Sequence, residues 1–201
     1  SGDALINGFL RADGANAGSY AGAGAGGTVL LQCRTLNGAD GVVSVDGGTA
    51  VSPDSPGLRG GGGGGGRIAV HFDTAAQAWT PGIRFSANGG YSQVECGNPG
   101  TLWFTDSRFL QPFVIHSGVW SAPDFGTSWS PPSLTISNAW FSFTQPGFAL
   151  TVTGDVTVVG NNAALCRLDL TNGAFSCGGD LRLEQSRLTL YQSDDPGAAP
   201  V

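Results

Sequence analysis

Lysine and methionine are absent from the 201-residue sequence, and glutamate occurs only at Glu95 and Glu184. Charged residues make up 12% of the chain, about half of the share that is usual in globular proteins. The formal net charge of −6 argues against nucleic acid or an anionic membrane surface as a partner. No apolar run approaches the roughly 18 residues that a membrane-spanning helix needs, so we expect no membrane insertion.

Glycine is the residue that the sequence has in excess, at 34 of 201 positions, where an ordinary domain has about 7%. So much glycine, together with the shortage of good helix formers, disfavours long helices. Valine, threonine, phenylalanine, isoleucine and tryptophan occur instead in short alternating runs, which are typical of β-strands. The composition therefore predicts an all-β protein.

A three-copy repeat occupies the first half, where 25 of the 34 glycines lie. In each copy a short strand ends at a turn, a glycine-rich excursion follows, and a second strand begins after glycine. The turns fall at Asp13, Asp46 and Asn88, which are 33 and 42 residues apart. Periods of this length that tolerate insertions indicate a solenoid.

The alternation within these strands is consistent from copy to copy. Aligning the copies stacks apolar residues in columns, and their polar neighbours in the first strands, Arg11, Ser44 and Ser86, fall on the opposite face. One repeat cannot bury such a column alone, whereas stacked repeats can. The columns are Leu10, Val43 and Phe85, then Val29, Ile68 and Leu102, then Leu31, Val70 and Phe104.

The second half continues the pattern with few glycines. Residues 150–158 resemble residues 175–183 at an offset of 25, and residues 134–136 begin an earlier copy. Such a repeat predicts a right-handed parallel β-helix, a β-solenoid whose layers rise by ~4.8 Å. We expect glycine-rich layers with side loops over 1–104, an irregular layer over 105–133 and regular layers over 134–201. These would form one continuous domain of a longer chain.

Three stretches carry a resemblance to known proteins: GGGGGGGRIAV at 60–70, FSANGG at 85–90, and the paired Gly-Asp corners at 154–155 and 179–180. With them the chain resembles the pectin-lyase-like β-helix family. More narrowly, it is similar to the glycine-rich β-helix repeats of very large secreted or surface proteins. The resemblance implies an extracellular or cell-surface location, and it spans adhesins, filaments and polysaccharide-acting enzymes.

The glycine runs allow two interpretations. Residues 22–27 match a dinucleotide-binding spacing, but a strand follows them where that motif needs a helix, so we expect no nucleotide and no other cofactor. The longer run is either a flexible linker or a packed, glycine-walled flap of stacked excursions with polyproline-II character. It consists of Gly60, Gly61, Gly62, Gly63, Gly64, Gly65 and Gly66.

The four cysteines leave disulfides and buried thiols open. Cys166 and Cys177 both share the parity of inward residues, so a bridge between them competes with two buried thiols. A bridge from Cys33 to Cys96 would have to skip a layer. The even number of cysteines keeps two bridges open, and no cysteine or histidine spacing suggests zinc.

Candidate chemistry is sparse. His71 and His116 fall on outward positions as surface imidazoles. Asp155 and Asp180 stack at equivalent corners, and Asp13, Asp46 and Asn88 form a second ladder. Turn geometry explains these residues best, with weak Ca²⁺ binding by Asp155 and Asp180 as the alternative and no catalytic residue identified. Outward Trp103 and turn residue Tyr91 are candidates for glycan contact.

These observations favour a non-catalytic structural or adhesive segment of a cell-surface or filament protein. Its open ends would expose strand edges, and we expect them to stack on neighbouring domains or on other copies. The alternative is a polysaccharide-acting lyase or hydrolase, or a carbohydrate-binding β-helix.

Overall fold

The computed structural model describes residues 2–18, 20–50, 60–109, 117–121, 126–137, 139–143, 145, 147–160, 166–171 and 173–191. In this part the protein is all-β, as the composition predicts, and a three-residue 3₁₀ helix, η1 (Ser107–Phe109), is the one helix found there. None of the helical structure in these ranges is long or apolar enough to span a membrane. The strands of the first half are β1 (Ala4–Leu5), β2 (Phe9–Arg11), β3 (Thr28–Gln32), β4 (Leu36–Asn37), β5 (Val42–Ser44), β6 (Arg67–His71), β7 (Arg84–Ser86) and β8 (Thr101–Phe104).

The remaining strands lie in the second half. They are β9 (Gly118–Ser121), β10 (Ser128–Trp129), β11 (Leu134–Ser137), β12 (Trp140–Phe143), β13 (Ala149–Val152), β14 (Val156–Val159), β15 (Arg167–Thr171), β16 (Ala174–Cys177), β17 (Leu181–Glu184) and β18 (Arg187–Tyr191).

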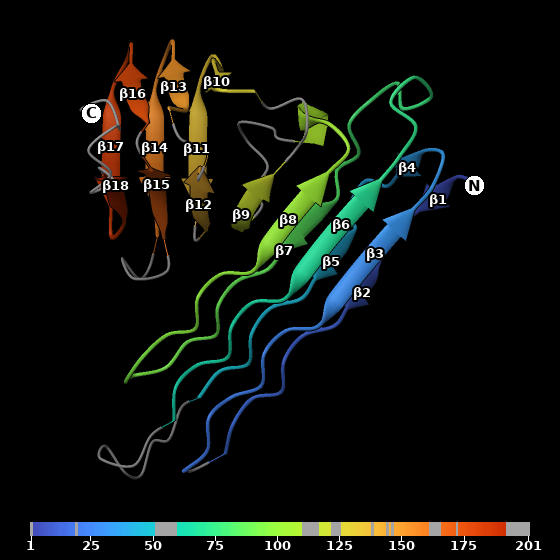
Figure 1. Cartoon of the computed structure of the whole chain (residues 1–201), viewed down its shortest axis with the longest axis vertical. Coiled ribbons are helices and arrows are strands. Elements are labelled where there is room, and N and C mark those ends of the chain that lie inside the picture. The colour runs from blue at the N-terminus through green and yellow to red at the C-terminus, as the bar shows by residue number, and fades with distance from the viewer. Residues whose placement is uncertain are drawn as a thin grey trace.

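Every strand pair in the described ranges is parallel, and consecutive layers of the chain supply neighbouring strands (Figure 1). One sheet of seven strands runs through the whole molecule in the order β18-β15-β12-β9-β8-β6-β3. The other strands form the sheets β2-β5-β7, β10-β13-β16, β11-β14-β17 and β1-β4. Strands β16, β17 and β18 therefore form the last layer, and β1, β2 and β3 belong to the first.

The register expected from the alternation is confirmed. Leu10 lies opposite Val43, and Val43 lies opposite Phe85. In the second half the offset of 25 residues is exact, since Leu150 pairs with Phe175 and Val156 with Leu181. Parity predicts these pairs because side chains alternate between the two faces of a strand, so a shift by one residue would expose every core side chain.

The inward columns form one hydrophobic core that extends from Val29 to Leu170. In the first half the Phe85 ring packs edge-on against Phe104 at 4.9 Å between centroids. In the second half Phe143 stacks on Phe148 at 4.6 Å. Burial of each such side chain stabilises the fold by roughly 1.5–3 kcal/mol, so the strand layers gain their stability from side-chain volume.

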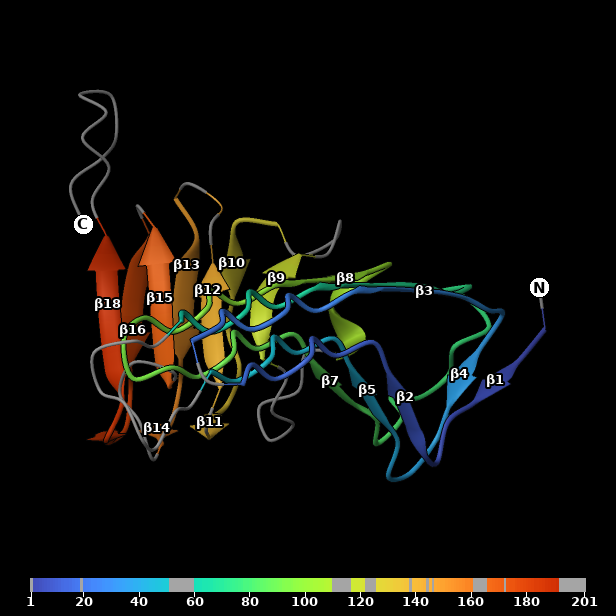
Figure 2. The same ribbon diagram turned by 90° about the horizontal axis from the view of Figure 1, so that it is seen from below.

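The glycine-rich excursions extend away from the strands as a flat arm, here called the paddle, which comprises residues 12–18, 20–27, 45–50, 60–66 and 87–100. Figures 1 and 2 show its extended segments running side by side, outward and back. Along 60–66 the backbone N–H groups repeat with a period of three, as in polyproline II. One donates to the neighbouring layer, the next donates to the other tier of the paddle, and the third position faces outward. The first kind includes Gly62 to Glu95 O and Gly65 to Asn98 O, and the second Gly63 to Gly48 O and Gly66 to Val45 O.

This packing explains the seven-glycine run. A Cβ at Gly63 would lie 1.9 Å from Gly24 O, and one at Gly66 would lie 1.9 Å from Gly27 O. At the outward positions the nearest atoms are 3.5 Å from a Cβ on Gly61 and 3.9 Å from one on Gly64. The run lies in the middle layer, which has neighbours on both sides, and therefore has the least space for side chains. These contacts support the packed flap and not the linker.

All four cysteines are free thiols, which corrects the bridges considered from the sequence. Cys166 is buried under Gly160, while Cys177 lies opposite Val152 with its thiol close to Gly154 O at 3.4 Å. Cys33 belongs to the same buried hydrophobic core as Phe72, and burial raises the pKa of its thiol. Cys166 precedes β15, whereas Cys177 ends β16. Cys33 follows β3, whereas Cys96 lies in the paddle. Each thiol therefore fills a separate space.

Candidate functional site

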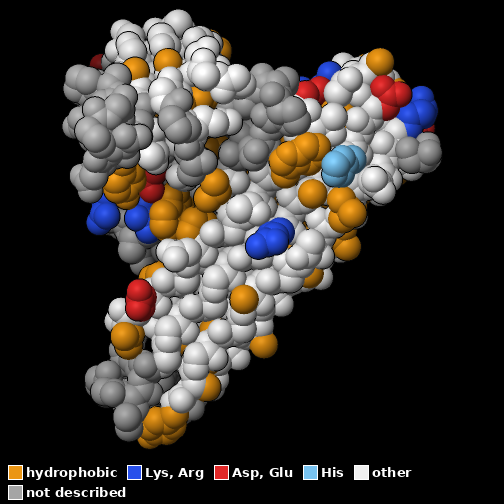
Figure 3. Space-filling view, viewed as in Figure 1, with side chains coloured by type: hydrophobic (Ala, Val, Ile, Leu, Met, Phe, Trp, Pro, Cys, Tyr) orange, Lys and Arg blue, Asp and Glu red, His pale blue; other side chains and the backbone are white. Residues whose placement is uncertain are grey.

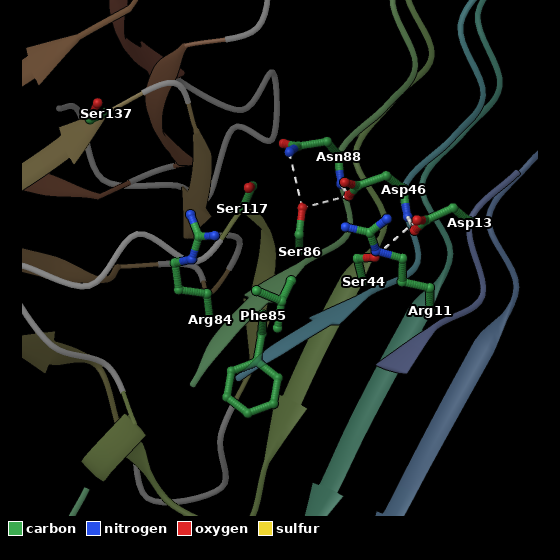
Figure 4. Close-up of a pocket in the computed structure, with 11 residues that line it drawn as sticks. Arg11, Asp13, Ser44, Asp46, Arg84, Phe85, Ser86, Asn88, Ser117 and Ser137 are labelled. Carbon is green, nitrogen blue, oxygen red and sulfur yellow. Dashed lines mark hydrogen bonds between the residues drawn. The ribbon is translucent and has the colours of Figure 1, made fainter. Parts of the chain in front are cut away.

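A polar groove of about 530 Å³ lies against the outer face of the β2-β5-β7 sheet (Figure 4). The parallel register places Arg11, Ser44 and Ser86 in one row, which a bridge from Ser86 extends to Ser117. Ser137 of β11 lines the groove from the second half of the chain. The sequence already marked Arg11, Ser44 and Ser86 as outward polar positions, but gave no signal that would bring Arg84 or Ser137 to the same place.

The ladder of Asp13, Asp46 and Asn88 forms one wall of this groove and serves the backbone. Asp13 accepts hydrogen bonds from the Asp46 N–H at 2.8 Å and from the Ser44 hydroxyl at 3.0 Å. Asp46 repeats this one layer later, accepting from the Asn88 N–H at 2.7 Å and the Ser86 hydroxyl at 2.5 Å. Each side chain therefore satisfies the donor of the next layer, which is the turn role expected for these residues.

Two arginines, Arg11 and Arg84, supply positive charge to the groove. Arg11 lies over the Phe9 ring at 4.4 Å, and no ion pair is found for Arg11 or Arg84 among the described residues. Burial raises the pKa of Asp46 above its ordinary 3.8, against the lowering effect of its bonds to Ser86 and Asn88. Two guanidinium groups and two carboxylates leave the groove with no net formal charge. It offers both donors and acceptors to a polar ligand.

The second stack repeats the backbone role. Asp155 accepts a hydrogen bond from the Asp180 N–H at 2.9 Å, so its carboxylate is occupied in the same way as that of Asp13. Within the described ranges no group of three or more histidine, cysteine, aspartate or glutamate side chains is placed to hold a metal ion. The geometry therefore gives the Asp155 carboxylate a structural function at the corner.

Trp103 and His71 lie together on the outer face of the seven-stranded sheet. Their ring centroids are 4.4 Å apart, with the ring planes tilted by 35°. Figure 3 shows the histidine side chain beside a hydrophobic patch on this open face. Two shallow depressions lie at the opposite ends of β6. One of about 390 Å³ lies beside His71, and one of about 330 Å³ lies beside Arg67. Trp103 and His71 thus lie outward, as their parity predicts.

Two other candidates lie away from these surfaces. Tyr91 is 37% exposed near the far end of the paddle, where its carbonyl accepts the Ala50 N–H. His116 lies outside the described residues. Neither residue joins the groove or the Trp103 face.

Among the described residues of the second half, the last layer carries the most exposed large apolar side chains. Leu181 and Leu183 are each 45% exposed and Leu190 is 43% exposed. Their partners one layer earlier, Val156, Val158 and Leu170, are completely buried. The inward columns therefore continue to the end of the described chain, where no further strand covers them.

No protein-family model, curated protein or solved structure matches the chain.

Proposed function

We propose that the protein is a non-catalytic structural or adhesive segment of an extracellular protein, built as a right-handed parallel β-helix. The uniformly parallel pairing and the recurrence of one register from layer to layer support this architecture. The location at the cell surface or in a filament rests on the resemblance in the sequence. Its work is mechanical: a stiff rod that joins other rods or domains at its ends.

The exposed leucines of the last layer carry the proposal. Within the described residues, three leucines of this layer are over 40% exposed beside three strand edges to which no further strand is paired. Such edges are templates for further strand pairing, and a single repeat unit gains stability from its neighbours. The surface therefore suits a stacking partner better than it suits solvent.

Mass and backbone hydrogen exchange test this function. The molar mass of the protein should rise with concentration, and the amides of β17 and β18 should exchange more slowly in the assembled form. Leu183→Lys should abolish both effects, whereas Leu30→Lys, which changes a leucine that is 59% exposed on a sheet face, should leave them intact. A constant monomer mass with unprotected β17 and β18 would refute the proposal.

Saccharide binding is a second candidate, favoured by the Trp103–His71 pair on a flat, open face. The half-buried indole of Trp103 presents an apolar ring with a polar edge, and Arg67, Thr101 and Gln32 supply hydrogen-bonding groups around it. A panel of polysaccharides should then show binding that Trp103→Ala removes. Trp79→Ala, at a tryptophan that is 65% exposed, is the matched control and should bind normally. Release of reducing ends from any polysaccharide would instead support the enzyme.

A further inference from the structure

The layers of the paddle differ in the space that they leave for a preceding layer. In the middle layer Gly48 and Gly60 leave no space for a Cβ, which would lie 2.0 Å from Ala15 O and 2.2 Å from Ala21 O of the first layer. In the third layer Gly90 has the same relation to Gly48 O, at 1.8 Å. These three positions must be glycine because a preceding layer is present.

The first layer has alanine at the corresponding positions, Ala15 and Ala21. Their methyl groups occupy the sites where a preceding layer would place its carbonyl oxygens. A further layer of the same geometry would therefore collide with both methyl groups. The paddle is closed at its first layer by side chains.

The other edge of the paddle is closed as well. Gly26 and Gly65 each donate a backbone N–H to the next layer, at 2.9 Å in both cases. The residue at the corresponding place in the third layer is Pro99, which has no N–H to donate. Proline is one of the devices by which proteins prevent unwanted pairing at an edge.

The last strand layer has none of these protections. Strands β16, β17 and β18 read AFSC, LRLE and RLTLY, without lysine or proline. Their inward positions carry no charge, and alanine methyls do not block the edge as they do in the paddle. The C-terminal layer is therefore an edge that the sequence leaves able to pair.

The outward side chains of β17 indicate which partner fits. Arg182 and Glu184 lie two residues apart on one face of the strand and pair with each other, with side chains 66% and 52% exposed. In an antiparallel pair of two β17 strands centred on Leu183, each Arg182 would lie opposite Glu184 of the other copy. Directly opposite side chains of unlike charge stabilise an antiparallel pair. The same two-fold axis brings Leu183 against its own counterpart, as self-complementary interfaces require.

We propose that the protein forms a two-fold dimer through its C-terminal layer, with β17 paired antiparallel to β17 of a second copy. The inference rests on the proposed stacking function and adds the end, the partner and the register. Because a two-fold contact uses the same face of both copies, the contact closes at two copies.

Charge reversal tests the register without disturbing the core, since both side chains are exposed. Arg182→Glu places like charges opposite each other twice per dimer, as does Glu184→Arg. Each should raise the dimer dissociation constant about tenfold or more in analytical ultracentrifugation. The double variant Arg182→Glu/Glu184→Arg should restore the dimer, and an equimolar mixture of the two single variants should form a heterodimer. Circular dichroism should show the same fold throughout.

Other outcomes separate this inference from the proposed function. Assembly that depends on Leu183 but ignores both charge reversals would overturn the register and keep the end stacking. Assemblies larger than two that Leu5→Lys disrupts would show that the first strand layer pairs as well, and would overturn the two-fold dimer. A protein that stays monomeric at every concentration would overturn both.

Discussion

The glycine-rich first half and the glycine-poor second half use the same parallel pairing but fill space in opposite ways. In the second half inward side chains such as Leu170 and Phe143 exclude water from the interior. In the paddle the backbones of neighbouring layers lie so close that a methyl group at Gly63 has no room beside Gly24 O. One region is stable because side chains are present and the other because they are missing. The comparison can be tested by adding or removing the same few atoms in each.

Removing side-chain volume should have the largest effect, and only where the layers are complete. Leu170→Ala, at a fully buried leucine, should lower the free energy of unfolding by about 2–5 kcal/mol. Leu190→Ala, at the partner of Leu170 in the last layer, should lower it by less than about 1 kcal/mol. Urea titration of the two variants measures the difference. Equal losses would mean that the last layer is already covered.

Adding a methyl group should destabilise the paddle at one position and not at the next. Gly63→Ala should cost about 1–3 kcal/mol, because the methyl group meets a backbone carbonyl that cannot move away. Gly64→Ala, one residue along the same run, should change stability by about 0.5 kcal/mol or less. Thermal unfolding of both variants settles the period of three. A similar loss at Gly64 would contradict the outward assignment.

The smallest effect should be a dependence on pH at Asp46. Because burial raises its pKa above 3.8, the folded state holds this proton more tightly than the unfolded chain does. The free energy of unfolding should therefore fall as the pH rises from the ordinary value through the raised one. Asp46→Asn should remove this fall while its amide oxygen keeps both hydrogen bonds. Asp46→Ala, which leaves the Asn88 N–H without its acceptor, should cost about 1 kcal/mol at any pH.

A pH profile of unfolding for these two variants checks the sign. If the difference between wild type and Asp46→Asn grew in favour of wild type as the pH rose, then the carboxylate would be stabilised in the fold and not penalised.

Much of the strand framework could be predicted because the relevant signal is local and repeated. The alternation in Val29–Leu31 and Val156–Val158 states which side chains share a face, and the repeat length states which residues stack. The polar neighbours Arg11, Ser44 and Ser86 followed from the same rule. Likewise, the sequence identified Asp13, Asp46 and Asn88 as turn residues, and the hydrogen bonds agree.

The rest depended on distances that a repeat does not encode. Parity placed both Cys166 and Cys177 inward but could not tell whether their sulfur atoms would meet, and they fill separate spaces. Ser137 reaches the groove from β11, which belongs to another sheet. The three-residue period of the paddle is hidden in a run of identical glycines, since only the hydrogen bonds reveal that Gly61 and Gly64 differ from their neighbours.

Those two unobstructed positions have an evolutionary consequence. Because a side chain at every third residue meets no neighbouring backbone, the paddle can change the side chains that it presents to solvent without losing stability. Natural variants of this arm should therefore accumulate replacements at three-residue intervals, with Gly61 and Gly64 changing while Gly63 and Gly66 stay invariant. The paddle would then present variable side chains on a conserved backbone.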